Sequence, residues 1–360
     1  MHFFGKGLLK DLQRKSDMEP FRESIVVIMP TFNGGEYIQE QIHSILNQSF
    51  NNFALHICDD ASTDQTVKIA TDLARKDKRI HLHKNLFQKG VIKNISDALT
   101  EIKADIYFLA DQDDIWLAEK MAKQMEVLQP DEVVMSCTNL SLVDENGCLM
   151  GVDFWSSQEI EAAEIRQAEN IAIKTMVTGC TMAFKKRLLN IALPIPEQAT
   201  MHDHWLSFFA VKIGKVVPIS EALVLYRQHS SNVIGASITP GQRRQRRYEG
   251  CVSYQDFKKR KYQSYQDLLV SIYAFEQRLT DNNMVHPPLK KYISFYDGLI
   301  NRQWMGAFGV ALKTKNIPGS NSLMRTLTLT ICFPVVFLFL KFFQNAGKPS
   351  EKLGNDYKKS

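Results

Sequence analysis

The sequence has few of the features that would assign it to a specialised class of protein. None of its six cysteines forms a Cys-x-x-Cys pair, which argues against a zinc site and favours free thiols in a reducing compartment. The formal net charge of +5 is too small to indicate a dedicated nucleic-acid-binding protein. No internal repeat or low-complexity tract is visible. With 44% hydrophobic and 23% charged residues, the chain has the composition of an ordinary globular protein of one or two domains.

A long hydrophobic run is also missing. Residues 326–340 carry no charge, but this run is shorter than the roughly 20 residues that a spanning helix needs, and Pro334 interrupts it. A buried helix, an interfacial segment and a re-entrant segment all fit. Residues 1–23 begin with a basic amphipathic stretch that lacks the apolar core of a signal peptide, and predict a frayed helix or a weak membrane-surface helix. We expect a cytoplasmic protein attached peripherally to the inner face of the cell membrane.

From residue 24 onward, short apolar runs alternate with segments of helical periodicity. The runs predict buried strands, and the segments between them predict helices packed on a sheet. The predicted strands are residues 24–29, 53–58, 80–83 and 105–110. Such alternation is typical of βαβ units and of an α/β fold with a mostly parallel sheet. Because ligands bind beyond the carboxyl ends of such strands, functional residues are expected in residues 30–36, 59–64 and 111–114.

The composition changes after about residue 235. Residues 242–261 contain eight basic residues against two acids, and the chain beyond them looks largely helical. We therefore divide the chain into an N-terminal segment, residues 1–23, a catalytic domain, residues 24–235, and a helical, basic C-terminal region, residues 236–360. The basic stretch is either a solvated helical surface or a face for anionic lipid headgroups or for the pyrophosphate of an acceptor.

Two acidic clusters follow predicted strands. Asp111, Asp113 and Asp114 lie within four residues, and carboxylates so close together repel one another unless a cation sits among them. Oxygen ligands of this kind suit Mg²⁺ or Mn²⁺, which would neutralise a diphosphate leaving group. The alternative is an acidic loop or helix cap at a strand end. Asp59 and Asp60 follow an earlier strand, where a carboxylate can accept a base N–H or a ribose hydroxyl.

The turn after Asp59 and Asp60 also has a structural interpretation. Ser62 or Thr63 is predicted to cap the helix that follows, since hydroxyl side chains are favoured at that position.

Three motifs, in this order, resemble those of the inverting family 2 glycosyltransferases with a GT-A fold. The segments SIVVIMPTFNGGEYIQEQIHSILNQSF, CDDASTDQT and LADQDDIW are similar to the family's first strand, loop and helix, its acidic nucleoside-binding turn and its metal-binding Asp-x-Asp. The resemblance covers residues 24–130. It implies a Rossmann-like, mostly parallel central sheet with a helical C-terminal extension, and a metal-dependent enzyme that uses a nucleoside diphosphate sugar donor.

The resemblance also implies roles for individual residues. Asp60 should bind the pyrimidine base with help from Asp59. Asp113 should be the principal metal ligand, with Asp111 near the ribose or the metal. The remaining nucleotide-binding residues implied in this way are Pro30, Thr31, Phe32, Asn33, Glu36, Lys89, Gly90, Lys93 and Gln112. In a purely structural interpretation, Gly90 is a helix-entry turn and Lys93 is a solvated charge.

The second half of the chain should supply the catalytic base. The segment MHDHW resembles the family's acidic-aromatic motif, which implies that Asp203 takes the proton of the acceptor hydroxyl in a single displacement; the alternative is a helix N-cap. His202 and Trp205 beside it, and Gly179, are expected on the acceptor side, although Gly179 fits a strand bulge equally well. The segment YRQHSSN resembles the family's YRxHxxN, which implies that His229 contacts the metal or a phosphate, with the arginine of the motif nearby. The alternative is a structural loop histidine.

The combination of ADQDDIW, MHDHW and YRQHSSN is most similar to bacterial rhamnosyltransferases of cell-surface polysaccharide synthesis. This implies transfer of a single L-rhamnose from dTDP-L-rhamnose to a glycan or lipid-linked acceptor. Because sugar choice depends on a few pocket side chains, UDP-glucose, UDP-galactose and a UDP-N-acetylhexosamine stay open as donors. The Q-x-x-R-W element of processive synthases is missing.

The sequence favours neither of two functions of other classes. A nucleotidyltransferase would normally carry a Lys or Arg in its phosphate loop, and residues 30–36 contain neither. An inactive sugar-nucleotide-binding protein would have no need to keep Asp60, Asp113 and Asp203 together.

Overall fold

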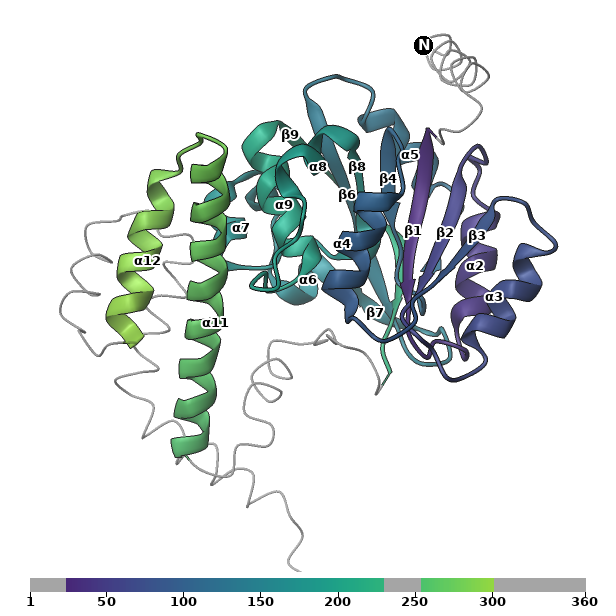
Figure 1. Cartoon of the computed structure of the whole chain (residues 1–360), viewed down its shortest axis with the longest axis horizontal. Coiled ribbons are helices and arrows are strands. Elements are labelled where there is room, and N and C mark those ends of the chain that lie inside the picture. The colour runs from purple at the N-terminus through teal and green to yellow at the C-terminus, as the bar shows by residue number, and fades with distance from the viewer. Residues whose placement is uncertain (1–23, 230–253, 301–360) are drawn as a thin grey trace, which may run out of the picture. The chain divides into compact units, whose positions relative to one another are not determined.

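The computed structural model describes residues 24–229 and 254–300, and shows a sheet flanked by helices (Figure 1). Residues 1–23, most of the basic stretch 242–261 and the apolar run 326–340 lie outside the described residues. In the described part, nine strands form one sheet in the order β3-β2-β1-β4-β8-β6-β9-β5, with β7 paired to β6. No helix in these two ranges is long and apolar enough to cross a membrane.

The first half of the sheet is parallel, as the alternating pattern predicts. Strand β1 pairs with β2 on one side and with β4 on the other, and β2 pairs with β3, all in parallel. The strands are β1 (Ile25–Thr31), β2 (Ala54–Asp59), β3 (Ile80–Lys84) and β4 (Ile106–Leu109), and the helices between them are α2 (Ile38–Leu46), α3 (Thr66–Ala74) and α4 (Val91–Glu101). The predicted strands and helices of this half are therefore confirmed to within a few residues.

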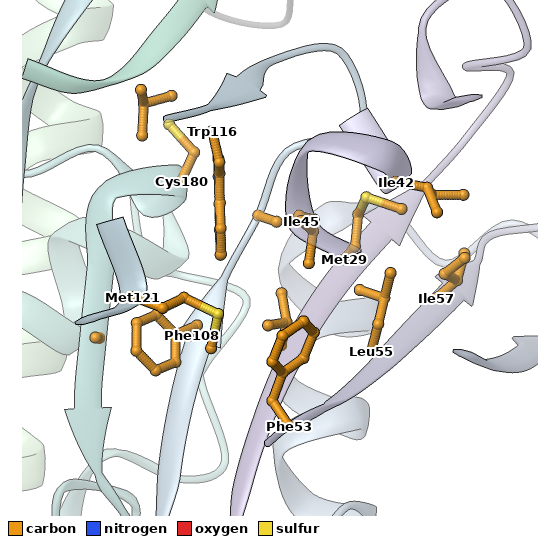
Figure 2. Packing of buried hydrophobic residues seen from close by; sticks show 14 of the residues in the cluster. Met29, Ile42, Ile45, Phe53, Leu55, Ile57, Phe108, Trp116, Met121 and Cys180 are labelled. Atoms are coloured by element: carbon orange, nitrogen blue, oxygen red, sulfur yellow. The ribbon is translucent and has the colours of Figure 1, made fainter. Parts of the chain in front are cut away.

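The core lies between this sheet and helices that cover it. Alternate residues of β1 and β2, such as Met29 and Leu55, point to the side where α2 contributes Ile42 and Ile45 (Figure 2). Strand residues of the opposite parity, such as Val26, are also fully buried. Both faces of the parallel half are covered, which explains why its strands appear in the sequence as unbroken apolar runs.

The second half of the sheet is mixed. Strand β8 (Met182–Lys185) runs antiparallel to both β4 and β6 (Val133–Val143), and β6 pairs in parallel with the long strand β9 (Lys215–Arg227). Strand β5 (Ile115–Trp116) pairs with the end of β9. The other elements are α5 (Lys120–Val127), β7 (Leu149–Asp153), α6 (Phe154–Gln158), η1 (Glu164–Arg166), α7 (Ala168–Ile173), η2 (Gly179–Thr181), η3 (Lys186–Leu188), α8 (Leu189–Ala192) and α9 (His202–Ile213).

Two further helices, α11 (Tyr254–Asp281) and α12 (Pro287–Ile300), follow the second undescribed segment. Of the described residues, 24–229 and 266–293 belong to one compact unit, and 254–265 with 294–300 belong to a second. Within the first unit, Phe275 stacks on Phe208 at a centroid distance of 4.1 Å, and Arg278 donates to the carbonyl oxygens of Ile191 and Leu193. Within the second, the rings of Tyr265 and Tyr296 lie 5.8 Å apart.

The predicted cap of helix α3 is wrong. The helix begins at Thr66, and its N-cap position is Gln65, whose side chain makes no capping bond. The Asp64 carboxylate accepts the Thr66 N–H at 3.0 Å instead. The Ser62 hydroxyl has other partners, since it donates to Asp59 and its oxygen accepts the Asn33 N–H at 2.9 Å.

Candidate active site

The predicted site residues gather at one edge of the sheet. The carboxyl ends of β1, β2 and β4 meet there because these strands are parallel. Strand β8 runs the other way, so its beginning, just after Gly179 and Cys180, lies at the same edge. The topology therefore joins the acidic clusters of the first half to the start of β8.

Asp59 organises the turn after β2. Its buried carboxylate accepts hydrogen bonds from the Thr31 hydroxyl at 2.9 Å and from the N–H and hydroxyl of Ser62 at 2.9 and 2.5 Å. Pro30, the neighbour of Thr31 on β1, pairs with Cys58 and is half-buried. Asp59 thus fixes the shape of the predicted nucleoside pocket.

Gln112 ties the loop after β1 to the acidic motif after β4. Its side chain accepts the Phe32 N–H at 2.9 Å and donates to the Phe32 carbonyl at 3.1 Å. A Cβ on Gly34 would lie 2.2 Å from Gln112 Oε1, so this close approach requires glycine. Asn33 holds the other side of the loop, since its N–H donates to Ser62 and its side chain accepts the Thr63 N–H, both at 2.9 Å.

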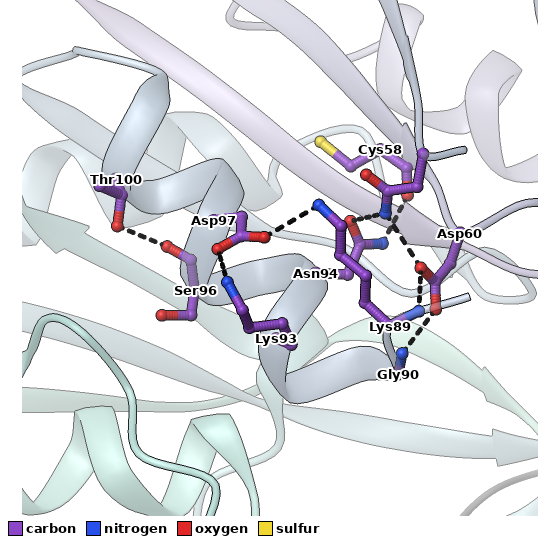
Figure 3. Close-up of polar contacts among 10 residues, drawn as sticks. Cys58, Asp60, Lys89, Gly90, Lys93, Asn94, Ser96, Asp97 and Thr100 are labelled. Atoms are coloured by element: carbon purple, nitrogen blue, oxygen red, sulfur yellow. Dashed lines mark hydrogen bonds and ion pairs between the residues drawn. The ribbon is translucent and has the colours of Figure 1, made fainter. Parts of the chain in front are cut away.

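Asp60 holds the segment between β3 and α4 (Figure 3). Its buried carboxylate accepts the N–H groups of Lys89 and Gly90 at 2.9 and 2.8 Å and the Asn85 side-chain amide at 2.9 Å. Gly90 is also the N-cap residue of α4. The structure therefore brings three of the predicted nucleotide-binding residues together, with Asp60 at the centre.

The charged side chains beside this segment are paired or exposed. Lys89 and Lys93 both form ion pairs with Asp97 of α4, which lowers the pKa of that carboxyl against the opposing effect of its partial burial (Figure 3). Asn94, one residue after Lys93, donates to the Cys58 carbonyl at 2.7 Å. Glu36 is exposed, at the start of the turn into α2.

The acidic motif after β4 is a cluster of interacting carboxylates. Burial, followed by the charges of Asp113 and Asp203, raises the pKa of Asp111 to about 7. Burial, followed by the charges of Asp113 and Asp111, raises the pKa of Asp114 well above its ordinary value. Oxygen atoms of Asp111 and Asp114 and the Cys180 sulfur lie within 4.8 Å of one another. Burial also raises the pKa of the Cys180 thiol, which keeps it protonated and makes it a poor metal ligand.

The structure places His229 beside Asp113, the predicted principal metal ligand. The distance from His229 Nε2 to Asp113 Oδ2 is 2.8 Å, and the His229 ring lies 4.9 Å from the ring of Tyr37. A carboxylate and an imidazole are donors that suit Mn²⁺, so this pair fits a divalent ion better than the group that contains Cys180. Two residues that are 116 positions apart in the sequence thus meet at this edge of the sheet.

Arg227, two residues before His229, holds the acidic motif in place. Its buried guanidinium donates to the main-chain oxygens of Asp113 and Glu145, each at 2.9 Å, and to the Glu40 carboxylate at 2.6 Å. The main-chain N–H of Arg227 donates to the Asp114 carboxylate at 3.2 Å, and the guanidinium carbon lies 4.8 Å from the Tyr37 ring centroid. The guanidinium is therefore committed to the protein itself rather than aimed at solvent.

Asp203 lies in the first turn of α9, and Met201 rather than Asp203 is the N-cap residue. One carboxylate oxygen accepts the Gly179 N–H at 3.1 Å and the other accepts the His204 N–H at 2.6 Å. Burial raises the pKa of Asp203 to about 6, and the two hydrogen bonds oppose that shift. A carboxylate with such a pKa is matched to accepting a proton near neutral pH.

The close approach of Gly179 to α9 explains the glycine at that position. A Cβ there would lie 2.6 Å from His202 Nε2. His202 is buried, and burial lowers its pKa to about 4, so the ring is neutral at pH 7. Gly179 therefore packs against His202 and binds Asp203 through its N–H, which fixes the position of the Asp203 carboxylate.

Trp205 lies on the packed side of α9. Its ring stacks on Phe275 at a centroid distance of 5.1 Å, and its indole N–H donates to the Ala192 carbonyl at 2.7 Å. The side chain is almost fully buried, so Trp205 supports the helix that carries Asp203.

Lys120 is a buried lysine that the sequence pattern did not predict. Its Nζ lies 3.7 Å from the Trp116 ring centroid and 5.3 Å from that of Phe108, and donates to Gln124 at 2.9 Å. Burial lowers its pKa to about 7, and the acidic neighbours Cys180 and Asp114 oppose that shift. A lysine is usually assigned to the surface, and no signal in the sequence marks this one as buried.

Comparison with known proteins bears on this geometry. The profile of glycosyl transferase family 2 matches residues 26–190. The UDP-Glc:α-D-GlcNAc-diphosphoundecaprenol β-1,3-glucosyltransferase WfgD of Escherichia coli is 30% identical over 214 residues, which span 58% of this chain and 79% of that enzyme. This chain belongs to glycosyl transferase family 2.

A second relative from Escherichia coli, the enzyme WfaP with the same named activity, is 28% identical over 211 residues, which span 59% of this chain and 80% of WfaP. Among solved structures, residues 1–349 of Staphylococcus aureus TarS in complex with UDP-GlcNAc match with a TM-score of 0.51 at 18% identity, over 81% of this chain and 76% of that one. This likeness concerns the fold, and confirms the predicted GT-A class. The chain is therefore a family 2 glycosyltransferase with a mostly parallel α/β sheet and helices after it.

Proposed function

We propose that this family 2 enzyme transfers a single sugar, with inversion, from a pyrimidine nucleoside diphosphate to a hydroxyl of a lipid-linked, cell-surface glycan precursor. The proposal is carried by one observation. Asp203 accepts the Gly179 N–H at 3.1 Å, and the sulfur of the next residue, Cys180, lies within 4.8 Å of carboxylate oxygens of Asp111 and Asp114. A proton acceptor and a metal-binding motif therefore share one edge of the sheet.

Each group has a distinct part in this proposal. Asp203 accepts the proton of the acceptor hydroxyl as that hydroxyl attacks the sugar. Asp113, Asp111 and His229 would hold Mg²⁺ or Mn²⁺, which supplies a Lewis acid for the departing diphosphate. Asp59, Asp60 and the loops that they organise would enclose the nucleoside, and Gly179 and His202 would border the acceptor.

The donor has two candidates with different support. Both Escherichia coli relatives are named for UDP-glucose and for an acceptor on diphosphoundecaprenol, which favours UDP-glucose and a lipid-linked acceptor here. The motifs in the second half of the chain favour dTDP-L-rhamnose. With a lipid-linked acceptor, the enzyme would work at the inner face of the cell membrane. Residues 24–235 would be its catalytic domain.

A donor panel tests the proposal. UDP-glucose, UDP-galactose, UDP-N-acetylglucosamine and dTDP-L-rhamnose are each incubated with the enzyme, Mn²⁺ or Mg²⁺, and an N-acetylglucosaminyl-diphosphate lipid. We expect release of the nucleoside diphosphate from one donor, and a product whose anomeric configuration, read by NMR, is inverted. Release of pyrophosphate from a nucleoside triphosphate and a sugar 1-phosphate, tested in a parallel reaction, would instead indicate a nucleotidyltransferase. No turnover of any of the four donors by folded enzyme would contradict the proposal.

The variant Asp203→Asn separates an enzyme from a binding protein. We expect it to bind donor and Mn²⁺ as the unsubstituted enzyme does, by calorimetry, but to lose transfer by a factor of at least about 100 because the proton acceptor is removed. Retention of full transfer would show that Asp203 is not the base.

A further inference from the structure

The loop between β3 and α4, residues 85–90, presents two large apolar side chains to solvent. Leu86 is 96% exposed and Phe87 is 67% exposed. Among the exposed large apolar side chains that the structure describes, these two alone are consecutive in the chain. Single exposed apolar residues are common on protein surfaces, whereas clustered ones usually mark a contact with a partner.

The fold holds these side chains outward. The Asn85 N–H donates to the Asp59 carbonyl at 2.8 Å, and the Asn85 side chain donates to Asp60 at 2.9 Å. On the other side of the tip, the N–H groups of Lys89 and Gly90 donate to the same Asp60 carboxylate (Figure 3). Because both ends of the loop are fixed to one buried carboxylate, the exposure of its tip is a property of the fold.

The surroundings of the tip are basic. Lys84 ends β3 and is exposed, and Lys89 and Lys93 follow the tip. The carboxylate of Asp97 pairs with both Lys89 and Lys93, which leaves three ammonium groups against this carboxylate and the buried one of Asp60. Apolar side chains flanked by lysines are typical of segments that lie in the interface of an anionic bilayer, where the rings enter the headgroup region and the ammonium groups meet phosphates.

We propose that residues 84–93 are an interfacial membrane contact of the catalytic unit, in which Leu86 and Phe87 insert among the headgroups of anionic lipid. The role of this contact in catalysis rests on the proposed function, because a lipid-linked acceptor requires the enzyme to work at a membrane. Asp60 would connect the membrane-bound loop to the donor side of the site. Binding to the bilayer itself requires no turnover. The contact lies in the described part of the chain and is separate from residues 326–340.

The insertion is tested with a tryptophan reporter in the full-length chain. The variant Phe87→Trp is mixed with vesicles of 70% phosphatidylcholine and 30% phosphatidylglycerol whose acyl chains are brominated. The matched control is Val285→Trp, because Val285 is 82% exposed in the turn before α12. After subtraction of the signal of the unsubstituted chain, we expect quenching at position 87 to exceed that at position 285 by at least about twofold, since bromine quenches only a ring that enters the bilayer.

Three results would overturn the proposal. Equal quenching at positions 87 and 285 would show that the tip stays in water. Quenching at position 87 that is as strong with pure phosphatidylcholine vesicles as with anionic vesicles would show that the lysines do not direct the loop to anionic lipid. A blue shift of the position 87 emission with UDP alone, and no response to vesicles, would mean that Phe87 covers the nucleotide instead.

A second measurement separates this contact from other membrane-binding segments and from catalysis. The double variant Leu86→Ser/Phe87→Ser should weaken vesicle partitioning by about tenfold relative to Val285→Ser, since two large side chains lose their apolar burial. Unchanged partitioning would contradict the proposal. If transfer fails with every donor but position 87 is still quenched, only the proposed function is refuted; if transfer proceeds without quenching, only the membrane contact is.

Discussion

Arg227 offers the sharpest test of how the site is held together. The substitution Arg227→Met removes two hydrogen bonds to main-chain oxygens, those of Asp113 and Glu145, and the stacking on Tyr37. Hydrogen bonds from a charged donor are worth about 1.5–3 kcal/mol each, and the stacking adds about 0.5–1 kcal/mol. The Glu40 carboxylate is 58% exposed, so its ion pair with Arg227 adds only about 0–1 kcal/mol. Because Glu145 lies in an exposed turn where water can replace the guanidinium, we expect a total loss of about 3–4 kcal/mol in the free energy of unfolding.

The measurement is urea unfolding, together with the Mn²⁺ concentration that gives half-maximal transfer. Release of the Asp113 main chain should raise that concentration by about tenfold, which corresponds to about 1.4 kcal/mol. Arg227→Lys should recover part of the stability, because an ammonium cannot reach three acceptors in a planar fork. The control is Arg75→Met, which breaks an exposed ion pair with Asp72 and should cost less than about 0.5 kcal/mol. A loss below about 1 kcal/mol for Arg227→Met, with unchanged Mn²⁺ dependence, would refute this account.

Three further predictions concern the base and the interior. For the free enzyme, kcat/KM should rise with pH through about 6, because Asp203 acts only when deprotonated; a profile flat from pH 5 to 8 would contradict this role. Gly179→Ala should lower kcat more than it raises the KM of the donor in steady-state kinetics, since the new Cβ would displace His202, the first residue of the helix that carries Asp203. Lys120→Met should leave Mn²⁺ binding by calorimetry within about threefold if the lysine acts mainly through packing on Trp116, whereas a larger loss would show that its charge supports the acidic motif.

The sequence predicts the parallel half of the fold well for a physical reason. Strands such as β1 and β2 are buried on both faces, so their apolar runs stand out from the intervening helices. Strand β8 is short and its pairing with β4 and β6 joins residues far apart in the chain, so no local pattern announces it. The predicted cap at Ser62 or Thr63 failed because the hydroxyl of Ser62 has a stronger partner in Asp59.

The site was predicted unevenly for a similar reason. The motifs implied that His229 contacts the metal or a phosphate, and the structure places its ring against Asp113, the predicted metal ligand. The roles of Gln112 and Arg227 as ties between loops depend on partners up to 187 residues away, which a sequence pattern does not encode. Lys120 escaped notice because burial of a lysine contradicts the usual tendency of that residue.

The antiparallel pairing of β4 with β8 has a consequence for how such an enzyme changes its specificity. The proposed metal-binding motif leaves the end of β4, and the segment that holds Asp203 through Gly179 leads into β8. In the proposed mechanism, the spacing between the departing diphosphate and the proton acceptor is set by a ladder of main-chain hydrogen bonds, which side-chain substitutions do not alter. Loops around that edge are then free to vary and accept new sugars while the reacting distance stays constant, whereas a one-residue shift in the register of β8 would separate the two halves of the reaction.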